Sequence, residues 1–74
     1  MNAKAYIIVY NGTSWEPREC EIVEETLDRF GHGLYKVKYT YNNQVKKASI
    51  PGRNIFFTYN AAKEFANHYS MRGN

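Results

Sequence analysis

The sequence predicts a small α+β domain, in which a curled antiparallel β-sheet or barrel of four to five strands is covered by a C-terminal helix. Short β-branched and aromatic segments alternate with turn residues as far as Phe57, a pattern typical of strands joined by hairpins. The apolar residues then change to helical spacing, in one stripe formed by Ala62, Phe65, Ala66 and Tyr69. Residues 1–74 have the size of a single domain.

The helix is expected over residues 59–71. Thr58 stands directly before it, where a hydroxyl accepts a hydrogen bond from the free N–H groups of the first turn. Phe57 and Ala62 occupy the two positions of a hydrophobic staple. Because the other side of this segment is polar, we expect its apolar stripe to lie on the sheet and shield it from water.

The first two strands are expected over residues 5–10 and 18–25. The first is apolar on both faces and ends at an Asn-Gly turn. In the second, Cys20 and Ile22 alternate with glutamates, so these two side chains face inward and the glutamates face solvent. Pro17 has no N–H for a strand ladder and belongs at the start of the strand or at an edge.

The next two strands form a predicted hairpin, residues 34–41 and 44–50, joined by an Asn-Asn turn. In its second strand, Val45 is out of step with Ala48 and Ile50, which predicts a bulge. Residues 54–57 then form a short fifth strand or a single helical turn.

The predicted core combines the inward positions of all these elements. Because so short a chain buries only about 60% of its unfolded surface, its large side chains must supply much of the core. The expected members are Ile7, Val9, Cys20, Ile22, Tyr35, Val37, Tyr39, Ile50, Ile55, Phe57, Phe65 and Tyr69.

Three segments carry a resemblance to known proteins: W-E-P-R-E-C-E-I-V-E-E, L-Y-K-V-K-Y-T-Y-N-N-Q-V-K-K-A-S-I and I-F-F. Their order resembles that of Tudor-like and Src-homology-3 (SH3)-like small barrels, and the likeness implies an SH3-like barrel fold. The ending I-F-F-T-Y-N-A-A-K-E-F is similar to that of many short uncharacterised bacterial and phage reading frames. In Tudor domains an aromatic cage binds methylated lysine or arginine; the aromatic residues near predicted loops here are Trp15, Phe30, Tyr41 and Tyr59.

No residue pattern in the chain is typical of an enzyme, a metal site or a cofactor site. Cys20 lies between two glutamates, whose negative charge raises the pKa of a thiol, so we interpret it as a core residue. Its spacing from His32 and His68 fits no metal framework. We therefore expect no catalytic residues, no metal and no cofactor. One cysteine and the lack of a long apolar run further predict a cytoplasmic protein without a membrane span.

Charge is distributed unevenly along a chain whose net charge is +3. Residues 16–28 hold six of the seven acids against one Arg18, whereas residues 29–58 hold six basic residues and no acid. This asymmetry predicts a binding surface on and around the hairpin 34–50. Its candidate residues are Lys36, Lys38, Tyr41, Lys46, Lys47, Arg53 and Trp15.

We interpret the chain as a small non-enzymatic interaction module that binds a protein partner through a strand edge or through complementary charge. A phage or mobile-element protein acting on a host complex is one such case. The alternative is nucleic-acid binding through the basic, tyrosine-rich hairpin 34–50. Against that alternative, Lys36 and Lys38 are expected to face Glu19 and Glu21 of the neighbouring strand, which would cancel their field. An acidic strand beside a basic hairpin also allows a symmetric homodimer.

Overall fold

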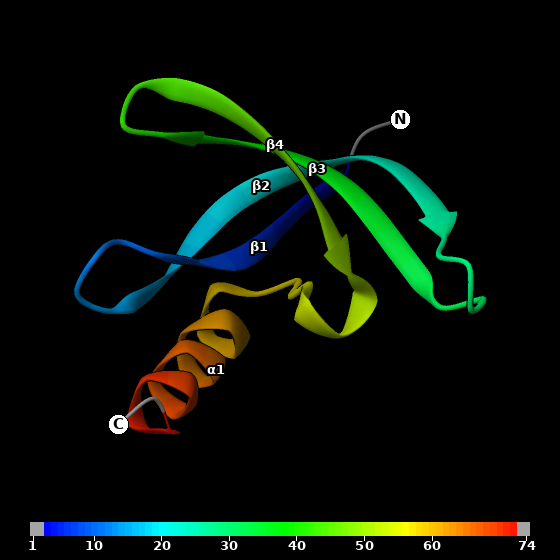
Figure 1. Cartoon of the computed structure of the whole chain (residues 1–74). Helices are drawn as coiled ribbons and strands as arrows, with labels where there is room; N and C mark the ends of the chain where they lie inside the picture. The colour runs from blue at the N-terminus through cyan, green and yellow to red at the C-terminus, as the bar shows by residue number, and fades with distance from the viewer. Residues whose placement is uncertain (1–2, 73–74) are drawn as a thin grey trace.

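The computed structural model describes residues 3–72, with side chains as far as Tyr69. It contains one four-stranded antiparallel sheet and a C-terminal helix, which confirms the α+β class (Figure 1). The strands are neighbours in chain order: β1 (Ala3–Tyr10), β2 (Trp15–Leu27), β3 (Gly33–Tyr41) and β4 (Gln44–Pro51). A short 3-10 helix, η1 (Gly52–Asn54), leads from the sheet toward helix α1 (Tyr59–Arg72).

The two asparagines predicted to join β3 and β4 do so in a two-residue turn. Asn42 and Asn43 have φ angles of 51° and 63°, the left-handed values that a type I′ hairpin needs at both central positions. The β1–β2 loop is longer than the expected Asn-Gly turn. Its Asn11 side chain accepts hydrogen bonds from the backbone N–H groups of Thr13 and Ser14, both at 2.9 Å. This side chain therefore takes the place of a tight backbone turn.

The β2–β3 loop is organised by one carboxylate. Asp28 Oδ1 accepts hydrogen bonds from the backbone N–H of Phe30 at 2.8 Å and of His32 at 2.9 Å. The N–H of His32 is the main cause of a lowered Asp28 pKa, because a carboxylate that accepts hydrogen bonds favours its charged form. Gly31 completes the loop with a φ of 84°.

The sheet has its β-bulge in β2. The prediction of a bulge in the fourth strand is wrong. The register between β2 and β3 shifts between Ile22 and Glu24, whereas β4 pairs with β3 without a shift. Val45 interrupts the apolar alternation of β4 because it is simply solvated, with 65% of its surface exposed. β2 also begins earlier and ends later than predicted. Pro17 pairs with β1 at a point where β3 has left β2, so it does lie beside a free edge.

One face of the sheet, which we call the inner face, carries the main core. Its buried side chains are Ala5, Ile7, Cys20, Val37 and Ile55. Partly buried residues surround them, namely Val9, Ile22, Tyr35, Tyr39, Ala48 and Ile50. The inward positions predicted from strand alternation are therefore confirmed. The predicted core omitted Ala5 on this face, and it also omitted Ala62 and Ala66 of the helix, which are buried as well.

Helix α1 covers the opposite, outer face of β1 and of the first half of β2. Tyr6 alternates with the core residues of β1 and meets Tyr59 edge-on, with ring centroids 6.1 Å apart. Trp15 lies on the same face and meets Tyr69 at 5.0 Å. Figure 1 shows the helix below β1 and β2, with the tip of the β3–β4 hairpin above them. The two strands are thus covered on both faces.

The segment before the helix divides its side chains between these two layers. Phe56 exchanges two backbone hydrogen bonds with Tyr6, at 2.7 and 2.9 Å, which forms an isolated bridge on the free edge of β1. Ile55 joins the core of the inner face, and Phe56 packs on Phe65 of the helix at a centroid distance of 5.1 Å. This bridge is all that the described residues form of the expected fifth strand, so the sheet is open.

Two residues at this end differ from the expected core. Phe57 is 66% exposed, because the alternation that points Phe56 at the helix turns the next side chain away from it. The predicted staple between Phe57 and Ala62 is therefore wrong, and Phe56 makes the contact with the helix instead. Tyr69 packs on Trp15 and Phe65 but remains 42% exposed. The cap is confirmed, since the Ala61 N–H donates to Thr58 Oγ1 at 3.1 Å.

Replacing Phe65 with alanine tests the docking of the helix. The ring is half-buried between Phe56 and Tyr69, so we expect a loss of about 2 kcal/mol in the free energy of unfolding, less than the roughly 3–5 kcal/mol of a fully buried phenylalanine. Urea unfolding measures it, with the exposed Lys63→Ala as the control. A loss no larger than that of the control would contradict the docked helix.

Acid titration tests the Asp28 loop. Because the pKa of Asp28 is lowered in the folded state, its contribution to stability is complete above its unfolded pKa of about 3.9 and is lost as pH falls through the lower folded value. We expect Asp28→Asn to be less stable than the wild type at pH 7, and the difference to narrow below about pH 4. Thermal unfolding across this pH range measures it; a difference independent of pH would contradict the assignment.

Candidate functional site

The free end of the β3–β4 hairpin leaves the rest of the sheet. Pairing between β2 and β3 stops at Glu21 and Lys38, whereas β3 remains paired with β4 as far as the turn. The hairpin end therefore projects as a two-stranded ribbon, seen at the top of Figure 1. We call residues 39–46 the hairpin tip.

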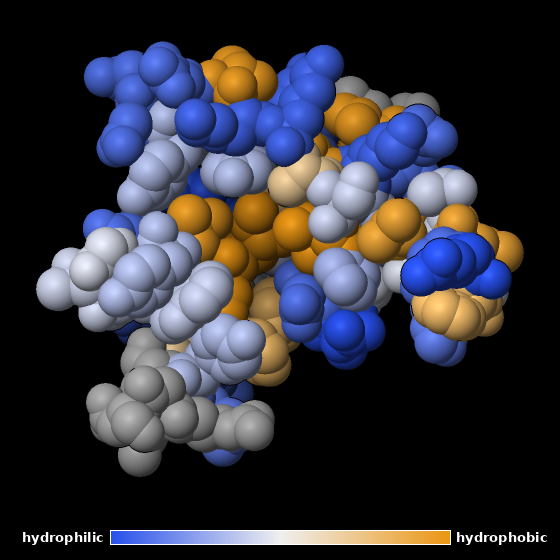
Figure 2. Space-filling model, viewed as in Figure 1, coloured by the Kyte–Doolittle hydropathy of each residue, from blue (hydrophilic) through white to orange (hydrophobic). Residues whose placement is uncertain are grey.

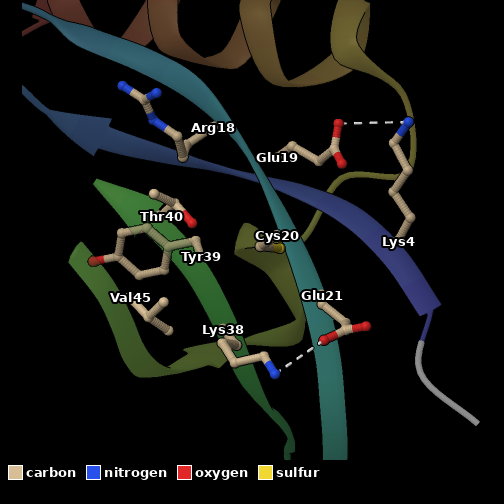
Figure 3. A pocket seen from close by; sticks show the side chains of 9 residues that line it. All are labelled: Lys4, Arg18, Glu19, Cys20, Glu21, Lys38, Tyr39, Thr40 and Val45. Atoms are coloured by element: carbon tan, nitrogen blue, oxygen red, sulfur yellow. Dashed lines mark ion pairs between the residues drawn. The ribbon is translucent and has the colours of Figure 1, made fainter. Parts of the chain in front are cut away.

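A hollow of about 680 Å³ separates the first half of β2 from the hairpin tip (Figure 3). Its polar margin contains two ion pairs, Lys38 with Glu21 and Lys4 with Glu19, each at 3.5 Å. Tyr39, Thr40 and Val45 line it from the hairpin side. Its charged groups are largely matched within the chain, so the hollow offers no concentrated charge of one sign.

The predicted basic residues are divided between the two faces of the hairpin. Strand alternation and register place Lys36, Lys38 and Lys47 on the outer face, whereas Lys46 lies opposite Tyr39 on the inner side. Arg53 belongs to η1, at the other end of β4. The single continuous surface expected from the sequence is therefore not formed.

Glutamates of β2 partly neutralise the outer face. Lys38 pairs with Glu21, one of the two glutamates expected to face the lysines, whereas Lys36 pairs with Glu24 at 3.6 Å. The bulge in β2 shifts the register by one residue and brings Glu24 opposite Lys36. Glu19 pairs instead with Lys4 of β1.

Of the predicted surface residues, the cations without an ion pair to another described residue belong to β4 and η1. Among the described residues, no ion pair involves Lys46, Lys47 or Arg53. Lys47 lies directly across from Lys38 in the register, and like charges at such positions repel. Positive charge is therefore concentrated along β4.

β4 is also an edge strand along its whole length. β3 occupies one side of it, and the part of the chain that the structure describes places no strand on the other. Its outward backbone N–H and C=O groups are consequently available to a further strand. The free edge strand and the unpaired lysines therefore coincide on β4.

Of the predicted aromatic residues, only Tyr41 belongs to the hairpin tip, and the others lie elsewhere. Trp15 lies between Tyr10 and Tyr69, on the face that the helix covers. Tyr41 lies under the guanidinium of Arg18, 5.4 Å from it. Tyr59 meets Tyr6, and Phe30 lies in the β2–β3 loop beside His32. The four aromatics proposed as a cage are thus in four separate environments and do not converge.

The reactive residues considered from the sequence lie apart from one another. Cys20 is buried, and burial together with the nearby Glu19 raises the pKa of its thiol to about 11. His32 is exposed in the β2–β3 loop, and His68 is exposed on the helix. Within residues 3–72, no three His, Cys, Asp or Glu side chains are grouped as a metal site would require. No described helix has the length and apolar character needed to cross a membrane.

Comparison of the chain with protein-family models, with curated proteins and with solved structures returned no match.

Thiol labelling tests the environment of Cys20. We expect the folded protein to react slowly with iodoacetamide at pH 8, because the raised pKa leaves little thiolate and the side chain is buried. Unfolding in guanidinium should restore the reactivity of an ordinary cysteine. Mass spectrometry over time measures both rates; equally fast labelling with and without denaturant would contradict the buried thiol.

Proposed function

We propose that this chain is a small non-enzymatic interaction module that binds a protein partner through β4 and the hairpin tip. The observation that carries the proposal is a strand edge eight residues long that combines free backbone groups with unpaired positive charge. Edges of this kind are usually shortened, covered or paired in proteins, because they attract other chains. Here the edge is long, and the features on it that could discourage pairing are Lys46, Lys47 and the terminal Pro51.

Solvent-exposed apolar surface supports the same reading. Val45 projects from β4 near the turn with 65% of its surface exposed. Beside it, Lys46 and Lys47 have long aliphatic stems that can cover an apolar contact while their ammonium groups stay in water. A protein partner uses both the apolar and the charged part of such a surface, and interface cores often combine these two features.

Nucleic-acid binding through the same hairpin is the second candidate. It is favoured by the repulsive neighbours Lys38 and Lys47, since a phosphate group near both would relieve their repulsion. It is disfavoured by the ion pairs of Lys36 and Lys38 with β2 and by the packing of Trp15 against Tyr69 of the helix. Base stacking would depend on Tyr39 and Tyr41, which are both partly buried.

We also propose kinship with the Tudor-like and SH3-like small barrels. Its support is the meander of four strands and the bridge between Phe56 and Tyr6, which begins the pairing that closes such a barrel. In this proposal the chain is an open member of that class.

Site-specific photo-crosslinking in the native cell tests the protein-binding proposal. A photoreactive phenylalanine analogue at Val45 should form an adduct with a protein of defined mass. The matched control is Leu27, which is equally exposed, at 66%, but lies at the end of β2. Lys46→Glu with Lys47→Glu should abolish the adduct, whereas Arg29→Glu with Lys63→Glu changes the net charge equally and should preserve it. No adduct at Val45, or equal adducts at both positions, would contradict the proposal.

Titration of fluorescent single- and double-stranded DNA and RNA separates the two candidates. We expect no binding at about 50 mM salt, where phosphate contacts are strongest. Binding that weakens steeply toward about 200 mM salt, and disappears in Lys46→Glu with Lys47→Glu, would overturn protein binding in favour of nucleic acid.

A further inference from the structure

We propose that β4 binds an extended, acidic segment of the partner protein as an added antiparallel strand, so that the partner supplies the fifth strand of the sheet. The inference rests on the proposed function and specifies how the partner binds.

The hairpin turn determines which backbone groups of β4 are free. A two-residue type I′ turn is closed by a hydrogen-bonded pair, here Tyr41 and Gln44, and such pairs recur at every second position of an antiparallel ladder. The N–H and C=O groups of Gln44, Lys46, Ala48 and Ile50 therefore point toward β3. Those of the alternate residues point away from the sheet: Val45, Lys47 and Ser49. A partner strand would bond to these three residues.

The charge of the edge selects an acidic partner over a second copy of this chain. Two β4 strands bonded edge to edge, with Lys47 as the middle of the three outward residues, would place Lys47 of one copy directly against Lys47 of the other. Like charges at directly opposed positions destabilise a sheet. The acidic residues of this chain cannot serve instead, because they lie mainly on β2, between β1 and β3. A glutamate pair from another protein would satisfy both lysines.

The inner face selects apolar residues at the other end of the partner segment. Ala48 and Ile50 point to that face, next to the core. Ile50 also borders a hollow of about 230 Å³, whose other walls include Ile7 of β1, Trp15 of β2 and Phe65 of the helix. Figure 2 shows apolar residues gathered in the hollowed centre of this view, with hydrophilic residues around them. A strand beside β4 would place its alternate side chains over this apolar surface.

These constraints define the partner segment residue by residue. In the antiparallel direction it has an apolar residue opposite Ile50, a small polar residue opposite Ser49 and an apolar residue opposite Ala48. Acidic residues follow opposite Lys47 and Lys46, and an apolar residue follows opposite Val45. The capped peptide Val-Thr-Val-Glu-Glu-Val is the simplest segment of this kind and serves as the probe.

Amide hydrogen exchange of the full chain, with and without millimolar probe peptide, tests the inference. Exchange should slow by about tenfold or more at Val45, Lys47 and Ser49, which are free in the unbound protein. The β4 amides that already bond to β3 should change far less. The matched control peptide Val-Thr-Val-Lys-Lys-Val should leave all of them unchanged. No slowing with the acidic peptide, or equal slowing with both peptides, would overturn the inference.

A proline at the edge supplies an independent test. Ser49→Pro removes an N–H that points away from β3, so the hairpin ladder is kept, and proline is tolerated on edge strands. It should abolish the peptide effect, whereas Ser49→Ala, which keeps the N–H, should preserve it. The peptide effect should also be abolished when the wild-type chain is given a probe peptide N-methylated at the amides that face β4. This second test does not depend on the folding of a variant. Peptide binding that survives N-methylation would overturn strand addition.

The outcomes separate this inference from the function on which it rests. A protein adduct at Val45 without any effect of the peptide would leave protein binding in place and overturn strand addition. If neither the adduct at Val45 nor the peptide effect is observed, both protein binding and strand addition are overturned. Sedimentation of the free chain gives the remaining outcome: a dimer whose Val45, Lys47 and Ser49 amides are protected without peptide would show that a second copy occupies the edge, and would overturn the acidic partner.

Discussion

The structure depends on covering both faces of one pair of strands. β1 is apolar on both faces, so a single layer packed against one face would leave the apolar side chains of the other face exposed to solvent. The bridge between Phe56 and Tyr6 solves this by directing Ile55 to the inner face and Phe56 to the helix on the outer face. Two backbone hydrogen bonds thus fix where the chain passes from one layer to the other. This arrangement places α1 on β1 and β2, and within the described residues nothing pairs with the outer edge of β4.

The unpaired outer edge of β4 links the fold to the surface that we propose for binding. In a closed barrel the last strand would find a partner within the chain, and its lysines would be ordinary surface charges. Here the segment after β4 turns through η1 and joins β1 at a single bridge, so the opposite edge of the sheet stays free. The free edge coincides with the positive charge that β2 does not neutralise. Geometry and electrostatics therefore single out the same strand.

Much of the fold could be predicted because local patterns agreed with it. Alternation identified the inward positions of β3, the Asn-Asn pair specified its turn, and Thr58 marked the start of the helix. The bulge at Val23 could not be predicted, because a one-residue register shift depends on how neighbouring strands pair. The exposure of Phe57 was missed for a related reason: the bridge at Phe56, a contact distant in sequence, decides which of two adjacent phenylalanines meets the helix.

The candidate site was predicted in composition but not in arrangement. The sequence identified the lysines of the hairpin, yet only the register shows that Lys46 lies on the other face from Lys47. Amide exchange of the free chain shows whether the edge of β4 is unpaired. We expect exchange to alternate along this strand, slow at Lys46 and Ala48 and fast at Val45, Lys47 and Ser49. Uniformly slow exchange along β4 would mean that its edge is already paired, and the binding surface proposed here would then not exist.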